Sequence, residues 1–291
     1  VRTIYEAPIS FFKEKLDLQV LNYFNLRSKK PANLRPWKKI TKIILHTKRH
    51  VNIAIIGKYV ELKDAYKSLD EALTHGGIDN NVKINLLRID SEKLKVSEIK
   101  SKLKNISGIL IPGGFGKRGT DGKIAAIKDA RNNKIPFLGI CYGMQMAIIE
   151  FARNKLSLKK ATSSEYDKHG LAIIGLMNEW NKDGKKIKGT DKNLGGTMRL
   201  GSYDAKLIKN TKIHKIYGKN LIKERHRHRY EVNIAFKEKF EKNGMIFSGL
   251  SPDGKLPEII ELKNHPWFVG VQFHPEFKSR PLSPHPLFSS F

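Results

Sequence analysis

Apolar and polar residues alternate along the first half of the chain in blocks that predict strands and helices in turn. Residues 51–59 (VNIAIIGKY) form an apolar run that ends near Gly57, as expected of a buried strand. Residues 64–77 carry apolar side chains at helical spacing, and the pair Gly76-Gly77 predicts the end of that helix. Further strands are predicted at 82–89, 106–114 and 135–140, with a helix at 119–132. The alternation predicts an α/β fold whose central, mostly parallel sheet is flanked by helices.

The second half has shorter apolar runs with few long helices between them. These runs predict additional mixed or antiparallel strands that complete the same domain, at 171–176, 197–208, 245–251, 257–263 and 267–276. In sheets of this kind ligands bind beyond the carboxyl ends of the strands. We therefore look for chemistry in the residues that follow strands.

The first 50 residues have a different pattern. Residues 1–26 form a short stretch with apolar spacing near that of a helix, which we interpret as the tail of another domain. Residues 27–50 are basic and interrupted by Pro31 and Pro36, and they predict a linker. The main domain then spans 51–291. The chain starts with Val1 and has no signal-peptide pattern, so we expect a fragment or a processed chain.

The net charge of +27 raises the question of nucleic-acid binding. The lysines are scattered from end to end, and the sequence has neither zinc-finger spacing nor the aromatic pattern of an RNA-recognition module. We therefore interpret the charge as a general enrichment of lysine at surface positions along the whole chain, and we expect no specific nucleic-acid partner. No apolar stretch approaches the roughly 18 residues that a membrane span needs, so no membrane partner is expected.

The only cysteine, Cys141, lies between a predicted strand and a predicted helix in the pattern G-x-C-x-G, with Gly139 and Gly143 on either side. This pattern is typical of a nucleophile elbow, where small residues let the strand and the helix approach closely. A helix N-terminus stabilises a thiolate, and the N–H of Tyr142 would point at an oxyanion. The elbow alone leaves open a structural cysteine in the core. A lone cysteine also fits a reducing, cytoplasmic compartment.

A second candidate segment, His274-Pro275-Glu276, ends the last apolar run. Pro275 fixes its own φ and keeps His274 extended, and side chains two residues apart on an extended segment share a face. The carboxylate of Glu276 can therefore orient the imidazole and support its positive charge. Together with Cys141, the segment predicts a Cys-His-Glu catalytic triad.

The segments GICYGMQ (139–145) and QFHPE (272–276), in this order, resemble the two signatures of the class I glutamine amidotransferases. The resemblance implies that Cys141 attacks the side-chain amide of glutamine, that ammonia leaves with a proton from His274, and that water hydrolyses the glutamyl thioester. Further segments resemble the CTP synthases within that family, and residues 1–26 resemble the end of their synthetase domain. These segments are 57–73, 111–119, 193–201, 224–233 and 264–277.

The resemblance also implies residue roles in glutamine binding. The glycine-rich segment 113–116 would form the oxyanion loop, with the N–H of Gly114 beside that of Tyr142. Glu165 would hold the amino group of glutamine, and Arg229 would pair with its carboxylate. Residues of the elbow would line the pocket: Tyr142, Gly143, Met144 and Gln145. No metal site is expected, because His226 and His228 alternate with arginines that would repel a cation.

In this family UTP, ATP and glutamine give CTP, glutamate, ADP and phosphate. The resemblance implies that the ATP, UTP and Mg²⁺ sites, and most tetramer contacts, belong to an N-terminal synthetase domain outside this chain. The glutaminase domain itself would need no cofactor. GTP is the implied allosteric activator, with Lys117, Arg118 and residues 185–188 as candidate contacts. The chain ends at HPLFSSF, where the family continues into a final helix, and we expect this end to expose apolar surface.

Three alternatives stay open from the residues alone. The first is another class I enzyme, such as GMP synthase or a γ-glutamyl hydrolase, which would lack the RHRHRYEVN segment. The second is a basic nucleic-acid-binding protein with an inactive fold and an unreactive Cys141. The third is an inactive, degenerate copy of such an enzyme. The complete set of Cys141, His274 and Glu276 argues against this alternative.

Overall fold

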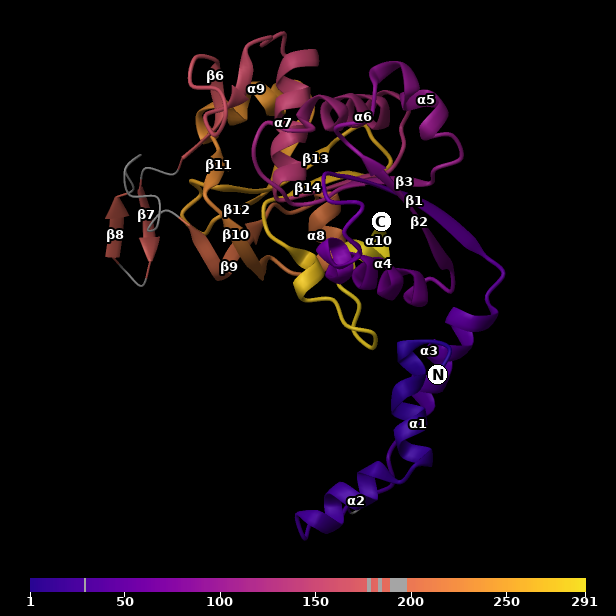
Figure 1. Ribbon diagram of the computed structural model, residues 1–291. Helices are drawn as coiled ribbons and strands as arrows, with labels where there is room; N and C mark the ends of the chain where they lie inside the picture. The colour runs from indigo at the N-terminus through magenta and orange to yellow at the C-terminus, as the bar shows by residue number, and fades with distance from the viewer. Residues whose placement is uncertain (29, 177–178, 183–184, 189–197) are drawn as a thin grey trace.

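A nine-stranded mixed sheet runs through the centre of the computed structural model, which describes residues 1–28, 30–176, 179–182, 185–188 and 198–291 (Figure 1). The strand order is β10-β9-β12-β13-β14-β4-β3-β1-β2. One half is parallel and consists of β1 (His50–Gly57), β2 (Lys83–Asp90), β3 (Gly108–Ile111), β4 (Phe137–Ile140) and β14 (Phe268–Val271). Its strands are the apolar runs of the first half together with the run that precedes His274.

The other half of the sheet is antiparallel and continues from β14. It consists of β13 (Pro257–Leu262), β12 (Met245–Leu250), β9 (Arg199–Leu207) and β10 (Leu221–His228). A small sheet contains β11 (Tyr230–Val232), β6 (Leu171–Leu176) and β5 (Ala161–Ser163), and β7 (Glu179–Lys182) pairs with β8 (Lys185–Lys188). The predicted α/β class, with a parallel sheet extended by mixed strands, is confirmed.

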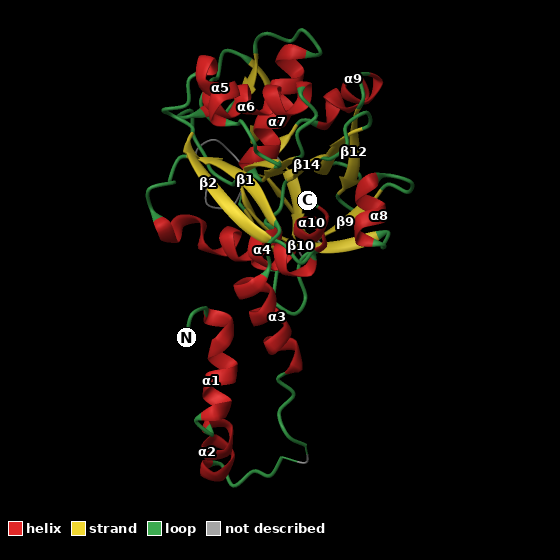
Figure 2. Ribbon diagram, turned by 90° about the vertical axis from the view of Figure 1, so that its right-hand side faces the viewer, coloured by secondary structure: helices red, strands yellow, loops and turns green. Residues whose placement is uncertain are grey.

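Helices cover both faces of the large sheet and enclose two apolar cores (Figure 2). On one face lie α5 (Ile99–Lys102), α6 (Thr120–Asn132), α7 (Tyr142–Asn154) and α9 (Lys237–Lys242). On the other lie α4 (Lys67–Asp79), α8 (Lys212–Tyr217) and α10 (Pro286–Ser290). Cys141 belongs to one of these two cores and directly follows β4. The predicted nucleophile therefore lies at the edge of the sheet where β4 ends.

Helix α4 does not end at Gly76-Gly77 as predicted, but continues to Asp79. A Cβ at Gly76 would overlap the carbonyl oxygen of Phe288 and lie 2.7 Å from its carbon, and one at Gly77 would lie 2.7 Å from Ile84. The two glycines therefore allow α10 and β2 to pack closely against the helix. The end of the chain does not expose apolar surface as predicted, because Leu287 and Phe288 are buried against the domain.

The N-terminal segment forms an arm that extends from the domain (Figures 1 and 2). It contains η1 (Ile4–Glu6), α1 (Ala7–Lys13), α2 (Leu16–Tyr23) and α3 (Arg35–His46). Residues 27–50, predicted as a linker, thus include a helix of 12 residues, because Pro36 occupies its first turn, where a missing N–H costs nothing. Tyr5 fastens the arm to the domain through a 2.5 Å hydrogen bond from its hydroxyl to Glu71.

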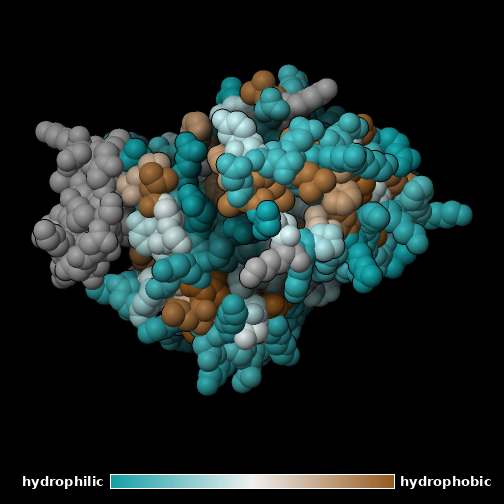
Figure 3. All heavy atoms as spheres, turned by 90° about the horizontal axis from the view of Figure 1, so that it is seen from below, coloured by the Kyte–Doolittle hydropathy of each residue, from teal (hydrophilic) through white to brown (hydrophobic). Residues whose placement is uncertain are grey.

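Many apolar side chains of the arm reach solvent. Phe11, Leu18, Tyr23 and Phe24 are each more than half exposed. The view from below shows hydrophobic side chains gathered in patches between hydrophilic ones (Figure 3).

Among the described residues, no helix has both the length and the apolar character that crossing a bilayer requires.

Candidate active site

The strand-to-helix turn at Cys141 is strained and tightly packed. Cys141 has φ 51° and ψ −102°, an unusual conformation for a residue with a side chain, and its N–H donates to the carbonyl of Val271 at 2.6 Å. A Cβ at Gly139 would lie 2.7 Å from the carbonyl carbon of Gly143, and one at Gly143 would overlap the carbonyl oxygen of Ile111. Glycine at both positions therefore lets β3, β4 and α7 meet, with Cys141 at the tip of the turn.

His274 lies beside Cys141 because β14 and β4 are neighbouring parallel strands. Val271 is paired with Ile140, so the residues that follow both strands emerge at the same edge of the sheet. Nδ1 of His274 lies 2.7 Å from Oε1 of Glu276, within the short helix η6 (Pro275–Phe277). The backbone N–H of His274 donates to the carbonyl of Arg225 at 2.8 Å, which fixes the start of this turn.

The surroundings of His274 favour its charged form. Burial by itself would lower the pKa of this imidazole, but hydrogen bonds and charge attraction to Cys141 and Glu276 outweigh burial and raise the pKa to about 10. At neutral pH His274 therefore carries a proton. A protonated imidazole beside a thiol favours a thiolate–imidazolium pair, which is the reactive form of a cysteine nucleophile.

The loop after β3 completes this edge of the sheet. Strand β3 is the other neighbour of β4, so the loop from Gly113 to Gly116 faces the elbow. A Cβ at Gly113 would lie 2.7 Å from Cε1 of His274, and one at Gly114 would lie 3.7 Å from the ring of Tyr142. Three adjacent parallel strands thus bring a backbone loop, a cysteine and a histidine together.

Side chains from three other segments hold this loop. The ammonium of Lys58 donates to the carbonyl of Phe115, and the hydroxyl of Tyr142 donates to the carbonyl of Gly116. The N–H of Gly116 donates to Oε1 of Glu165 at 2.8 Å. The end of this loop is therefore held at Phe115 and Gly116 by contacts within the protein.

Residues 61–291 match the family described as Glutamine amidotransferase class-I. The chain belongs to this family. The glutaminase domain of Trypanosoma brucei CTPS is 38% identical, with a TM-score of 0.74 over 82% of this chain and 91% of that chain. The CTP synthase of Pelagibacter ubique is 88% identical over 291 residues, and that of Rhodospirillum centenum is 53% identical over 294. The predicted membership among amidotransferases of the CTP synthase type is confirmed.

Each of these two matches extends over 100% of this chain but only 54% of the curated relative. The chain therefore spans about half the length of these relatives. The region that it shares with the Trypanosoma brucei domain is the glutaminase half.

The amidotransferase site places the predicted glutamine-binding residues in different surroundings. Glu165 is half-buried against the loop 113–116, and burial raises its pKa while the Gly116 N–H and Lys58 oppose that rise. Arg229 is half-buried between β10 and β11. Met144, in contrast, is fully buried and packs under Gly270, so its side chain is part of the core.

Gln145 is also buried, and its side chain binds protein groups. Its Nε2 donates to the carbonyl of Tyr230 at 2.9 Å and to Oε1 of Gln272 at 3.2 Å. Since Tyr230 directly follows Arg229, Gln145 anchors the backbone beside that arginine. For Gln145 the structure therefore supports a positioning contact, whereas the prediction was a direct lining of the pocket.

The candidate GTP contacts divide between described and undescribed side chains. Lys117 is exposed, and Nε of Arg118 lies 2.9 Å from Glu92 in a solvent-exposed ion pair. The backbone of Lys185–Lys188 forms β8, but its side chains lie outside the described part of the chain.

A buried charged cluster under β10 was not predicted. On β10 Arg225 and Arg227 point outward, while His226 and His228 point inward and lie 2.9 Å apart between Nδ1 and Nε2. The guanidinium of Arg199 bridges Glu231 at 2.9 Å and Glu258 at 2.7 Å. Burial lowers the pKa of both histidines and, despite Arg199, raises the pKa of both carboxyls, that of Glu231 to about 7. Two buried carboxyls with one arginine therefore retain a proton.

This proton predicts how stability depends on pH. The folded chain keeps Glu231 protonated up to about pH 7, whereas the ordinary value for the group is 4.5, so folding takes up a proton between these values. The contribution of Glu231 to stability is thus largest below pH 4.5 and falls as the pH approaches 7, by roughly 2–3 kcal/mol. Glu231→Gln, which mimics the neutral acid, should weaken this dependence in urea denaturation at pH 5 and pH 7.5. Glu238→Gln, at an exposed position on α9, is the control. If the stability of both variants changed equally between pH 5 and pH 7.5, the prediction would be contradicted.

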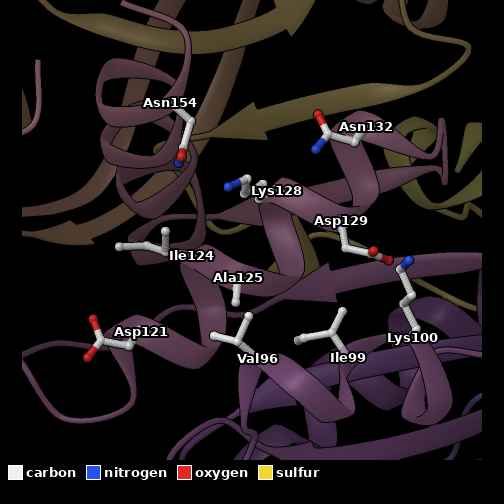
Figure 4. Close-up of a pocket in the computed structure, with 10 residues that line it drawn as sticks. All are labelled: Val96, Ile99, Lys100, Asp121, Ile124, Ala125, Lys128, Asp129, Asn132 and Asn154. Carbon is white, nitrogen blue, oxygen red and sulfur yellow. The ribbon is translucent and has the colours of Figure 1, made fainter. Parts of the chain in front are cut away.

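A separate pocket of about 390 Å³ lies between α6 and the segment around α5 (Figure 4). Its walls include Val96 and Ile99 on one side, and Ile124, Ala125 and Lys128 on the other. None of its lining residues belongs to the elbow, to the loop after β3 or to the His274 turn. The pocket is therefore distinct from the Cys141 site.

Proposed function

We propose that this chain is the glutamine-hydrolysing half of a CTP synthase and that Cys141, His274 and Glu276 carry out the hydrolysis. The observation that carries the proposal is the meeting of three groups at one sheet edge: a cysteine on a strained elbow, a histidine with a raised pKa, and a fixed glycine loop. Family membership supplies the substrate class, a carboxamide side chain.

The chemistry follows from these groups. The thiolate of Cys141 attacks the side-chain carbonyl carbon of glutamine, and the C=O electrons move to oxygen. When the tetrahedral intermediate collapses, the C–N bond breaks and the nitrogen takes a proton from the His274 imidazolium, so ammonia leaves. Neutral His274 then removes a proton from water, which attacks the thioester; glutamate leaves and the thiolate is restored.

The oxyanion would be bound by backbone groups. Tyr142 begins α7, and the first N–H groups of a helix have no partner within it. We propose that the N–H groups of Tyr142 and Gly114 receive the oxyanion together. Glu165 would bind the amino group of glutamine and Arg229 its carboxylate, with Gly143 providing close backbone approach.

The larger reaction concerns the whole protein. We propose that the ammonia aminates UTP at the expense of ATP, which would bind with Mg²⁺ in the other half of the relatives' length, with GTP as activator near Lys117 and Arg118. Residues 1–26 would be the end of that half, followed by the connection 27–50 and the glutaminase domain 51–291. The exposed apolar side chains of the arm support this division, as they would be covered by the preceding domain. A tetrameric, cytoplasmic enzyme is part of the same proposal.

The test is covalent labelling with a glutamine-mimicking diazoketone, 6-diazo-5-oxo-norleucine, followed by intact mass measurement. We expect one adduct, on Cys141, which excess glutamine prevents and Cys141→Ser abolishes. Acivicin, which is bound in the Trypanosoma brucei domain, is a second probe. A folded sample that forms no adduct with either reagent would refute a formed glutaminase pocket. Labelling that excess glutamine leaves unchanged would refute glutamine as the substrate.

A further inference from the structure

The sulfur of Cys141 has a second polar neighbour besides His274. Nε2 of Gln272 lies 3.7 Å from Sγ, within the range of a hydrogen bond to sulfur. Gln272 directly follows β14, its backbone N–H donates to the carbonyl of Glu258 at 2.8 Å, and the residue has no exposed surface. Gln272 and His274 both follow β14, and both side chains form hydrogen bonds with Cys141.

Neighbouring groups fix which end of the Gln272 amide faces the sulfur. Nε2 of Gln145 donates to Oε1 of Gln272 at 3.2 Å and to the carbonyl of Tyr230 at 2.9 Å. Turning the Gln272 amide over would bring two NH₂ groups together and put an oxygen against the sulfur. The two NH₂ groups would repel each other, and the oxygen would repel the sulfur when it is a thiolate. The NH₂ group of Gln272 therefore stays directed at Sγ.

The chain of contacts continues into the buried cluster. Nδ1 of His228 lies 3.2 Å from the same Tyr230 carbonyl that binds Gln145, and its Nε2 meets His226. The amide of Gln272 is therefore held at its far end by groups that are themselves fixed in the core. A donor held in this way reaches the sulfur without the entropic cost of ordering a free side chain.

We propose that Gln272 is the hydrogen-bond donor that stabilises the Cys141 thiolate and holds it for attack. This inference rests on the proposed function of Cys141. The proton of the thiol passes to the ring of His274, which gives a thiolate and an imidazolium, and an N–H of Gln272 then donates to the thiolate. A donor to the charged form favours that form, so Gln272 keeps the sulfur ionised while His274 changes its protonation state during the reaction.

The experiment measures the reactivity of the sulfur directly. Because Cys141 is the only cysteine, the rate of iodoacetamide alkylation against pH, followed by intact mass, reports the ionisation of this thiol alone. In Gln272→Met, which keeps the length but removes the donor, the midpoint of this profile should rise by about one pH unit, and the rate at a pH below the parent's midpoint should fall about tenfold. In Gln272→Glu a carboxylate would oppose the thiolate, and the midpoint should rise further.

Two readouts separate this role from a structural one. The glutaminase kcat should fall in Gln272→Met while the KM for glutamine stays within about twofold, and thermal denaturation should show a folded variant. A folded Gln272→Met or Gln272→Glu with the parent's alkylation profile would overturn the proposal. Diazoketone labelling of the parent chain reports the proposed function separately, since it does not depend on Gln272 variants.

Discussion

Replacement of Gly143 by alanine should destabilise the domain by more than about 3 kcal/mol, a large part of the roughly 5–15 kcal/mol that keeps a typical domain folded. The added Cβ would overlap the carbonyl oxygen of Ile111 and lie 3.0 Å from its carbon. Ile111 ends β3 in the middle of the sheet, and its backbone cannot rotate away as a side chain would. Ordinary over-packing costs about 1–3 kcal/mol, and a clash with a central strand lies at or above that range.

Urea denaturation of the parent chain and of Gly143→Ala would measure this effect. The matched control is Gly175→Ala in β6, where the nearest atom to the new Cβ, Oγ of Ser164, is 3.8 Å away. The control should change stability by less than about 1 kcal/mol, because alanine fits there and loses less entropy on folding. Equal stabilities for the two variants would show that α7 moves away from β3 at little cost.

The parallel half of the sheet could be predicted because each of its strands is a short apolar run between turn residues. Strand β10 could not be predicted in this way, because three of its four inward residues are Glu224, His226 and His228. Hydropathy indicates a strand by its apolar face, and here that face is polar and satisfied by charges from other strands. The alternation of arginine and histidine was visible, but its interpretation needed Arg199, Glu231 and Glu258.

Residues that usually interrupt helices were misjudged for a related reason. Gly76 and Gly77 predicted a helix end, and Pro36 predicted a linker, yet all three lie inside helices. The glycines are required by the close approach of Phe288 and Ile84, which are distant in sequence. Pro36 is tolerated because it lies in a first turn. Local propensity thus gave way to tertiary contacts and to position within the element.

The candidate site was accessible from sequence to the extent that its parts are local patterns. The elbow around Cys141 and the turn at His274 each occupy fewer than ten residues, so their spacing alone indicated them. Glu165 and Arg229 came only from the family resemblance. The donor Gln272 lay inside a quoted segment, but its contact with a residue 131 positions away depends on the pairing of β14 with β4.

Replacement of His274 by alanine should lower glutaminase kcat by at least about a thousandfold. In the proposed mechanism the residue supplies a proton to the leaving ammonia and removes one from water, so both halves of the reaction would lose their acid–base group. Loss of a triad member in hydrolases costs several orders of magnitude, and the third member costs less than the other two. Glu276→Gln, which keeps the shape but not the charge beside Nδ1, should therefore fall between the parent and His274→Ala.

Replacement of His274 should also change how the alkylation rate of Cys141 depends on pH. The raised pKa of His274, about 10, means that the imidazolium supports the thiolate through neutral pH. Without it the sulfur loses the positive charge that supports its ionised form, so the alkylation midpoint should move to higher pH in His274→Ala. His214→Ala on α8 removes a half-buried histidine that binds Asn220 and should leave both activity and alkylation unchanged.

Combining the substitutions distinguishes a catalytic unit from independent contributions. If Cys141 and His274 act in one step, Cys141→Ala should lose nearly all activity by itself, and adding His274→Ala should cause little further loss. If each contributed separately, the losses would multiply. Activity of His274→Ala within tenfold of the parent, in a folded sample that still labels at Cys141, would show that another group transfers the proton and that the His274–Glu276 pair serves structure instead.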